Sequence, residues 1–195
     1  MDKETIISKF ELKPLPDEGG LFRETYVSKD MIDISSLPSR YREEKHLYTS
    51  MMEKDPAVLM EQSSQYKKEK PLSTAIYYLL TDSPDSFSAI HRLASDEIWH
   101  FYLGDPVEML LLFPDGSGER RILGQDISAG QQVQTTVLQN TWQGARLISG
   151  GRYALMGTTV APGFDPTDYT HGDREQLCRV YPHFRDSIIT LTRTL

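Results

Sequence analysis

The sequence predicts a β-sandwich or β-barrel with a few flanking helices, and three observations support this prediction. Short runs rich in β-branched and aromatic residues follow one another closely between residues 73 and 162. Turn signals such as P-D-G-S-G and D-I-S-A-G-Q separate these runs. Few of the intervening stretches have room for the crossover helix that a parallel sheet requires. The expected fold class is therefore all-β.

The individual strands are placed by the alternation of apolar and polar residues and by the turns between them. One strand is expected at 21–28, directly after the turn P-L-P-D-E-G-G. The main set is expected at 73–80, 87–93, 97–103, 107–113, 131–138, 143–149 and 152–160. Such short, closely spaced strands are typical of antiparallel sheets joined by turns.

Helices are expected mainly near the two ends of the chain. Residues 2–12 place their apolar side chains on one helical face, and Asp2 can cap this helix. A second helical region is expected at about 172–194. Asp173 can cap its start, and Pro182 should break it into two pieces.

Residues 30–71 differ from the rest of the chain. They are polar, rich in Lys, Glu, Ser and Met, and interrupted by three prolines. Weak helical periodicity occurs between residues 47 and 59. We interpret the segment as a helical or loop insertion within a single domain that spans residues 1–195.

The composition is that of an ordinary globular protein, with 38% hydrophobic and 25% charged residues. A net charge of -7 argues against a broad surface for nucleic acid or anionic membranes, because such surfaces need clustered Lys and Arg. The first residues lack the apolar run of a signal peptide, and the longest apolar runs are too short to span a bilayer. One cysteine, Cys178, excludes an intrachain disulfide. We expect a cytoplasmic protein whose partner is a small molecule.

Five motifs in order resemble the DUF985 branch, also called cupin-5, of the RmlC-like cupin superfamily. They are L-K-P-L-P-D-E-G-G-L-F-R-E-T-Y, T-A-I-Y-Y-L-L, H-R-L-A-S-D-E-I-W-H-F-Y-L-G-D, L-G-Q-D-I-S-A-G-Q and V-A-P-G-F-D. The resemblance implies a double-stranded β-helix, a small jelly-roll barrel that is often a homodimer and is related in fold to sugar-nucleotide epimerases. It implies no particular reaction, because fold does not determine function.

The chain departs from the usual family pattern at two places. The family usually shows His-Pro-Glu-Gly-Gly near its start, whereas here Leu15, Pro16 and Asp17 precede Glu18 and the two glycines. No role of that histidine is carried over to this chain. The insertion at 30–71 is also longer than in the usual member.

A metal site of the cupin kind is only partly present in the sequence. Metal-binding cupins place two histidines one residue apart, then a glutamate followed six residues later by glycine, and a late histidine. Glu97 fits this pattern, but His91 stands without a second histidine, and Trp142 lies where the late ligand is expected. A divalent metal would have His91, Glu97 and His100 as its ligands, and this short ligand set favours a site without metal. No cofactor is firmly implied.

The residues His91 and Glu97 are the first candidates for acid–base chemistry. Strand parity puts Trp99, Phe101 and Leu103 on the face of Glu97, with His100 on the opposite face unless a bulge intervenes. An apolar barrel raises the pKa of Glu97 unless His91 or Arg92 pairs with it. A poised Glu–His pair is what proton abstraction next to a carbonyl requires. The alternative is a buried ion pair that only fixes the hairpin.

Further side chains are candidates for ligand binding. Trp142, at a strand edge, is a candidate for the pocket rim, and Trp99 for an apolar wall or simple core. Arg23 suits a phosphate or carboxylate, or else a surface salt bridge, and Tyr26 lies on the opposite face if the strand is regular. His100 serves as a further ligand contact or as a surface or dimer-interface residue.

Three functions remain open at this point. The first is an enzyme for a small polar metabolite, such as a carbohydrate derivative, with metal-independent epimerase or isomerase chemistry. The second is a non-catalytic ligand-binding protein that uses the same residues, and the third, less favoured, is a metal-dependent cupin enzyme.

Overall fold

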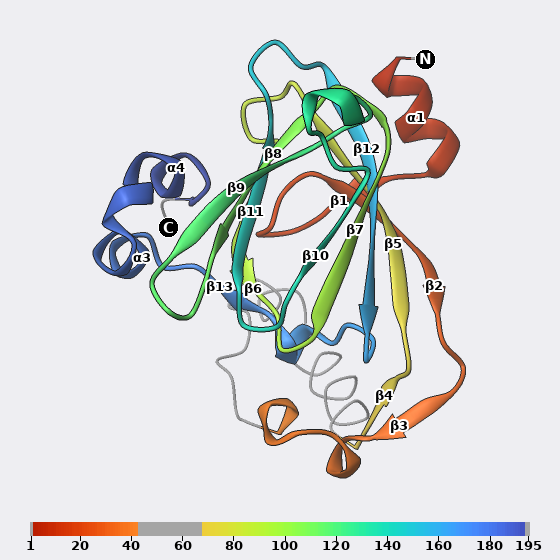
Figure 1. The fold of residues 1–195 in the computed structure, drawn as a ribbon. Coiled ribbons are helices and arrows are strands. Elements are labelled where there is room, and N and C mark those ends of the chain that lie inside the picture. The colour runs from red at the N-terminus through yellow and green to blue at the C-terminus, as the bar shows by residue number, and fades with distance from the viewer. Residues whose placement is uncertain (1, 43–67, 194–195) are drawn as a thin grey trace.

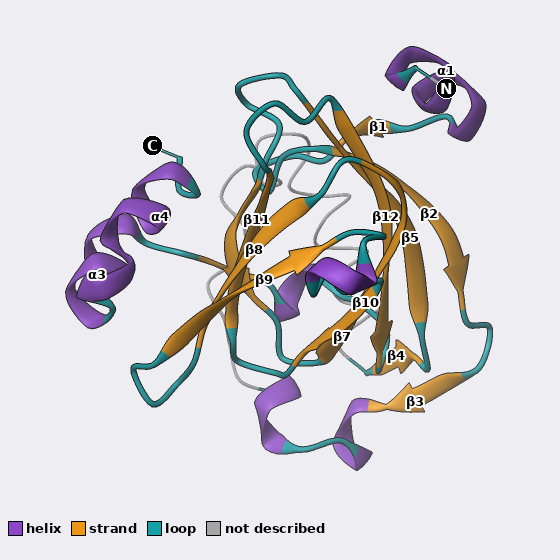
Figure 2. Cartoon of the chain, turned by 45° about the horizontal axis from the view of Figure 1, so that its top comes forward, coloured by secondary structure: helices purple, strands orange, loops and turns teal. Residues whose placement is uncertain are grey.

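The computed structural model describes residues 2–42 and 68–193, which form antiparallel sheets arranged as a barrel (Figures 1 and 2). The six-stranded sheet has the order β1 (Lys13–Pro14), β2 (Leu21–Val27), β5 (Thr74–Thr81), β12 (Tyr153–Ala161), β7 (Asp96–Gly104) and β10 (Gln134–Val137). The five-stranded sheet has the order β13 (Thr170–His171), β6 (Ser88–Arg92), β11 (Trp142–Leu147), β8 (Val107–Leu112) and β9 (Gly118–Leu123). The all-β class and the jelly-roll barrel are thereby confirmed.

The strands expected between residues 21 and 162 are all present, with small differences at their ends. Strand β9 was not predicted, because its residues G-E-R-R-I-L lack a regular alternation of apolar and polar side chains. The two-residue strands β1 and β13 are too short to produce any pattern.

The insertion begins and ends in a small two-stranded sheet of its own. Strands β3 (Met31–Asp33) and β4 (Glu69–Pro71) pair antiparallel. Short 3₁₀ turns follow β3 at Ile34–Ser36 and Ser39–Tyr41. The predicted helical periodicity between residues 47 and 59 lies outside the described residues.

The main core fills the barrel between the two large sheets. Its buried members come from both sheets: Tyr78, Leu80, Trp99, Phe101, Val107, Met109, Leu111, Leu123, Val137, Ala145, Ala154 and Met156. One expected member is absent from this core. The register of β7 against β12 shifts between Phe101 and Leu103, and Leu103 therefore packs on the outer side of the sheet. Its predicted position on the face of Glu97 is wrong because this bulge reverses the alternation.

Helices cover parts of both outer sheet faces (Figure 2). Helix α1 (Lys3–Phe10) buries Ile6 against the outer face of the six-stranded sheet, and Asp2 caps it by accepting a hydrogen bond from the backbone N–H of Thr5, as predicted. Helices α3 (Arg174–Val180) and α4 (Arg185–Thr190) pack on the five-stranded sheet. Asp173 caps α3, and the 3₁₀ turn Pro182–Phe184 separates α3 from α4, which confirms the expected break.

A buried ion pair joins the insertion to the barrel. Lys70 on β4 contacts Asp168, which lies in the 3₁₀ turn Pro166–Asp168, and the two residues are only 1% and 4% exposed. The Lys70 ammonium also lies 5.6 Å from the centre of the Tyr41 ring. Tyr41 in turn makes a 3.1 Å hydrogen bond with Ser95, which follows β6 in the barrel. This end of the insertion is thus fixed by buried polar contacts.

Candidate functional site

Four buried polar side chains meet inside the barrel, from strands of both large sheets. His91 comes from β6, Gln143 from β11, and Glu97 and Trp99 from β7. The Gln143 amide nitrogen donates to Glu97 Oε2 at 2.6 Å and to His91 Nε2 at 3.3 Å. The Gln143 amide oxygen accepts from Trp99 Nε1 at 2.9 Å. The predicted pair, His91 and Glu97, is therefore brought together, with Gln143 as the bridge.

The hydrogen bonds fix which nitrogen of His91 carries a proton. His91 Nδ1 lies 2.8 Å from the carbonyl oxygen of Ala89, and because a carbonyl only accepts, Nδ1 must donate. Nε2 is then free of a proton and accepts from Gln143. The Trp99 indole, a donor only, holds the Gln143 amide with its oxygen turned away from Glu97 and His91. The neutral imidazole keeps a basic nitrogen directed toward the centre of the cluster.

Burial shifts the pKa values of the two titrating groups in opposite directions. Glu97 is 6% exposed, and loss of hydration raises the pKa of its carboxyl, with the nearby His91 opposing the shift. His91 is 2% exposed, and burial lowers the pKa of its imidazole. Burial thus disfavours the charged form of each group, which suits proton transfer better than a fixed ion pair does.

A second carboxyl, which the sequence did not single out as a site residue, lies next to this cluster. Glu18 Oε1 accepts a 2.9 Å hydrogen bond from the Ser88 hydroxyl on β6. Glu18 is partly exposed, yet its carboxyl is surrounded by protein, and loss of hydration raises its pKa to about 7. The charge of Glu18 also raises the pKa of Glu97 and of Tyr78. The interior therefore holds two electrostatically coupled carboxyls.

An aromatic stack extends the cluster from His91 toward solvent. The Tyr169 ring stacks on His91 at 4.8 Å, and the His171 ring centre lies 6.5 Å from that of Tyr169. His171 pairs with His91 in the register of β13 and β6. Its Nδ1 is buried and has no hydrogen-bond partner among the described residues. Burial, followed by the proximity of His91, lowers the pKa of His171.

The remaining predicted site residues lie outside the barrel interior. His100 faces outward from β7, where it makes hydrogen bonds with Thr159 and Gln134. Trp142 packs with the helix-covered cluster on the outer side of the five-stranded sheet, and the Arg92 guanidinium lies 4.6 Å from its ring centre. Neither His100 nor Trp142 contacts Glu97, and Arg92 is not its partner.

Arg23 and Tyr26 also lie on the outer surface. The register of β2 against β5 shifts between Glu24 and Tyr26, so Arg23 and Tyr26 pair with Tyr77 and Ala75, which share one face. Opposite faces were expected for a regular strand, and this bulge makes the strand irregular. Arg23 donates to the carbonyl oxygen of Phe10 and makes an exposed ion pair with Glu11. This is the surface salt bridge that was the alternative to a ligand contact for Arg23.

The expected metal ligands do not converge. His100 lies on the face of β7 opposite to Glu97, which leaves His91 and Glu97 as the only pair of that set in the interior. In residues 2–42 and 68–193, no group of three or more His, Cys, Asp or Glu side chains is arranged to hold a metal ion. Because these residues do not fit a metal, no chemical step below uses one.

We expect Gln143→Leu to lower the free energy of unfolding by about 2 kcal/mol, because Trp99 and Glu97 would each lose a buried hydrogen-bond partner. Urea denaturation measures the change. Gln134→Leu on the exposed side of β10 is the matched control and should change stability by no more than about 0.5 kcal/mol. Equal losses in the two variants would contradict the structural role of Gln143.

Glu18 predicts a pH dependence of stability with a definite sign. Its pKa in the folded protein, about 7, lies above the ordinary value of 4.5, so folding favours the protonated form. Its contribution is complete below pH 4.5 and is lost as the pH rises through about 7. Glu18→Gln, which cannot ionise, should therefore gain thermal stability relative to the wild type across this range. A melting-temperature difference that stays constant from pH 4.5 to 7.5 would contradict this assignment.

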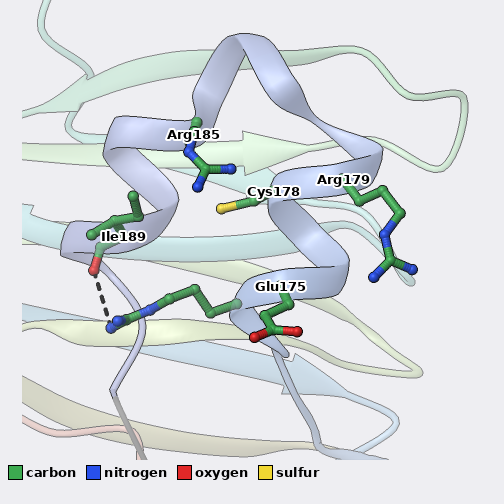
Figure 3. A pocket seen from close by; sticks show the side chains of 6 residues that line it. Glu175, Cys178, Arg179, Arg185 and Ile189 are labelled. Carbon is green, nitrogen blue, oxygen red and sulfur yellow. Dashed lines mark hydrogen bonds between the residues drawn. The ribbon is translucent and has the colours of Figure 1, made fainter.

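A separate groove lies on the far side of the five-stranded sheet, between α3 and α4 (Figure 3). It has a volume of about 560 Å³ and is lined by Arg174, Glu175, Cys178, Arg179, Arg185 and Ile189. The Cys178 thiol points into the space between the helices, but the residue is only 7% exposed. Arg174 donates to the Thr192 hydroxyl, to the Thr192 carbonyl oxygen and to the Ile189 carbonyl oxygen (Figure 3), and thereby joins α3 to the end of α4.

A family model for the cupin superfamily (DUF985) matches residues 4–172, which is most of the chain. The chain belongs to this cupin family. This cupin is similar to a hypothetical protein from Leishmania major, with 24% identity, a TM-score of 0.76 and full coverage of both chains. It is also similar to a protein from Shewanella oneidensis, with 25% identity, a TM-score of 0.76 and coverage of 100% and 99%. No match was found among curated proteins.

The comparisons confirm the family that the five motifs indicated and the cupin barrel that it implies. They name no reaction for this cupin, whose chemistry must be argued from its own side chains. No helix among the described residues is long and apolar enough to cross a membrane.

Proposed function

We propose that this cupin binds a small polar metabolite, such as a carbohydrate derivative, inside the barrel and moves a proton on it without a metal, as an epimerase or isomerase does. The observation that carries the proposal is the bridging contact of Gln143, whose amide nitrogen reaches both Glu97 and His91. A structural ion pair would have a charged donor at the position of this neutral amide. A neutral amide orients two titrating groups and leaves each able to gain or lose a proton.

The proposed step begins with removal of a proton from a carbon next to a carbonyl group. Glu97, as carboxylate, takes the proton, and the electron pair of the C–H bond moves to the carbonyl oxygen to form an enolate. Return of a proton to carbon completes the step, which consumes no oxidant or reductant. Between removal and return, His91 Nε2 takes this proton from Glu97 and gives it back, because Nδ1 is already committed to the carbonyl oxygen of Ala89.

The ligand approaches through the part of the site that is nearer to solvent. His91, Glu97, Trp99 and Gln143 are each at most 6% exposed, whereas Glu18 and His171 are partly exposed. A ligand that reaches Glu97 would therefore pass these two residues.

The second candidate is a ligand-binding protein without chemistry. The high burial of the central side chains favours this reading if ligand contacts are limited to Glu18 and His171. Assembly as a homodimer and a cytoplasmic location belong to the same proposal and rest on the family resemblance and the composition.

Binding is tested by isothermal titration calorimetry with neutral aldoses and ketoses and with the corresponding sugar phosphates. We expect at least one compound to bind the wild type and to bind Gln143→Leu at least tenfold more weakly, because that variant loses the polar centre of the site. Gln134→Leu is the control and should bind as the wild type does. Equal affinity in all three proteins would place the ligand elsewhere and overturn the proposed site.

A further inference from the structure

The loop that carries Glu18 is held tightly against strand β6. The Glu18 carbonyl oxygen accepts a 2.8 Å hydrogen bond from the Ala89 backbone N–H, and its carboxyl accepts from Ser88. On the other side of the loop, the Tyr78 hydroxyl donates to the Gly19 carbonyl oxygen at 2.9 Å. Contacts from both β5 and β6 therefore fix the backbone and the side chain of Glu18.

Arg193 holds the same loop in place through contacts on its outer side. Its Nε donates to the Asp17 carbonyl oxygen at 3.2 Å, its Nη2 donates to the Asp85 carbonyl oxygen at 3.0 Å, and the guanidinium lies 4.4 Å from the Phe87 ring centre. Gly19 has φ +92°, and a Cβ there would lie 2.2 Å from Arg193 Nη2. The loop can approach the arginine this closely only because residue 19 is glycine. Such a clamp is what a precisely positioned functional group requires.

Glu18 and Glu97 enter the site from different sheets. Glu97 belongs to β7 of the six-stranded sheet, whereas Glu18 is bonded to β6 of the five-stranded sheet. The Tyr78 hydroxyl bonds the carbonyl oxygen of Gly19, next to Glu18, and the Tyr78 ring packs edge-on against Trp99 at 5.6 Å. Trp99 in turn bonds Gln143, which donates to Glu97. The two carboxyls are therefore linked through one chain of contacts across the Tyr78–Trp99 pair.

We propose that Glu18 is the second acid–base group of the site, opposite Glu97, so that a bound carbon atom is deprotonated on one face and reprotonated on the other. The inference rests on the proposed function and deepens it from proton exchange to inversion at a stereocentre. Glu97 breaks the C–H bond, and the electron pair forms an enolate on the neighbouring carbonyl. The acid form of Glu18 then delivers a proton to the opposite face of the carbon, and the enolate electrons form the new C–H bond.

The charges around the two carboxyls define the class of substrate. The nearby cations in the described part of the chain are already engaged: Arg193 donates to backbone carbonyl oxygens, Arg92 stacks on Trp142, and Lys70 pairs with Asp168. An anionic group placed between Glu18 and Glu97 would meet like charge. The part of the substrate that enters the barrel is therefore uncharged, and an α-hydroxy carbonyl unit of a neutral sugar satisfies this condition.

The test uses neutral ketoses and aldoses in D₂O and measures two rates in one reaction. ¹H NMR gives the loss of the C–H signal, and chiral chromatography gives the inverted product. We expect Glu18→Gln to lose inversion by at least a hundredfold while the C–H signal still disappears within about threefold of the wild-type rate, because Glu97 remains. Glu18→Asp should restore part of the inversion. Glu175→Gln on the exposed side of α3 is the control and should change neither rate.

The outcomes separate the inference from the function on which it rests. Wild-type protein that exchanges no C–H proton in any sugar would overturn both together. Wild-type exchange with full inversion in Glu18→Gln would overturn the role of Glu18 alone. A parallel loss of both rates in Glu18→Gln would also overturn it, since that pattern indicates a structural contribution.

A ligand-free measurement supplies an independent readout. In protein labelled with ¹³C at the glutamate side-chain carboxyls, Glu18→Gln should move the titration midpoint of the Glu97 signal downward by removing a like charge. A Glu97 midpoint that is unchanged in Glu18→Gln would show that the two carboxyls are not electrostatically coupled and would overturn the inference.

Discussion

Replacing Glu97 with glutamine is expected to slow proton exchange on the bound metabolite by about 10²- to 10⁴-fold, the usual effect of removing a general base. Glutamine has nearly the shape of glutamate and can still accept from the Gln143 amide through its oxygen, so the contact at 2.6 Å survives. Ligand affinity should therefore change by less than about tenfold. The split between a large loss in rate and a small loss in affinity identifies a residue that acts on the reacting atoms.

The control for this prediction lies on the same strand. His100→Gln changes a histidine of β7 that faces outward and bonds to Thr159 and Gln134. It should leave both rate and affinity within about twofold of the wild-type values. If His100→Gln lowered the exchange rate as much as Glu97→Gln, the reacting atoms would have to lie on the outer face of the sheet.

Replacing Lys70 with methionine is expected to destabilise the fold by about 3–5 kcal/mol, the usual cost of removing one charge of a buried ion pair. Lys70 and Asp168 are 1% and 4% exposed, so water cannot replace the lost ammonium. Adding Asp168→Leu to Lys70→Met should recover most of the loss, because well-packed apolar side chains replace a buried pair at little cost. Thermal and urea denaturation both report the difference.

A surface pair provides the matched comparison. Lys3 and Asp82 also form an ion pair, but their side chains are 33% and 48% exposed. Lys3→Met should therefore cost less than about 1 kcal/mol. Similar losses from Lys70→Met and Lys3→Met would mean that burial does not govern the strength of these pairs.

The sequence allowed much of the fold to be predicted, since alternation and turn chemistry are local signals. The barrel strands, the cap at Asp2 and the helix break at Pro182 all follow from residues close together in the chain. The bulges at Thr25 and Tyr102 could not be predicted in this way, because a one-residue shift depends on the partner strand.

The residues of the candidate site likewise fall into those that local sequence patterns predict and those that only the tertiary structure reveals. Parity placed His91 and Glu97 on inward faces, and the structure brings them together. Gln143 carried no signal, because an amide within a strand acquires its role only when β11 pairs with β6 and places it beside His91. Glu18 was hidden for a similar reason: it bonds to Ser88, which is 70 residues away in the chain. Contacts between residues so far apart in the chain depend on the tertiary structure, so local sequence patterns do not predict them.

The most direct test of the central claim is the incorporation of solvent deuterium into a sugar that binds the wild-type protein. The sugar is incubated with the wild-type protein in D₂O and recovered, and its molecular mass is measured by mass spectrometry. A parallel incubation uses the Glu97→Gln variant. The proposed acid–base site predicts a gain of one mass unit with the wild type, at least a hundredfold faster than with Glu97→Gln. A bound sugar that gains no deuterium would contradict the claim and leave the barrel as a site of binding alone.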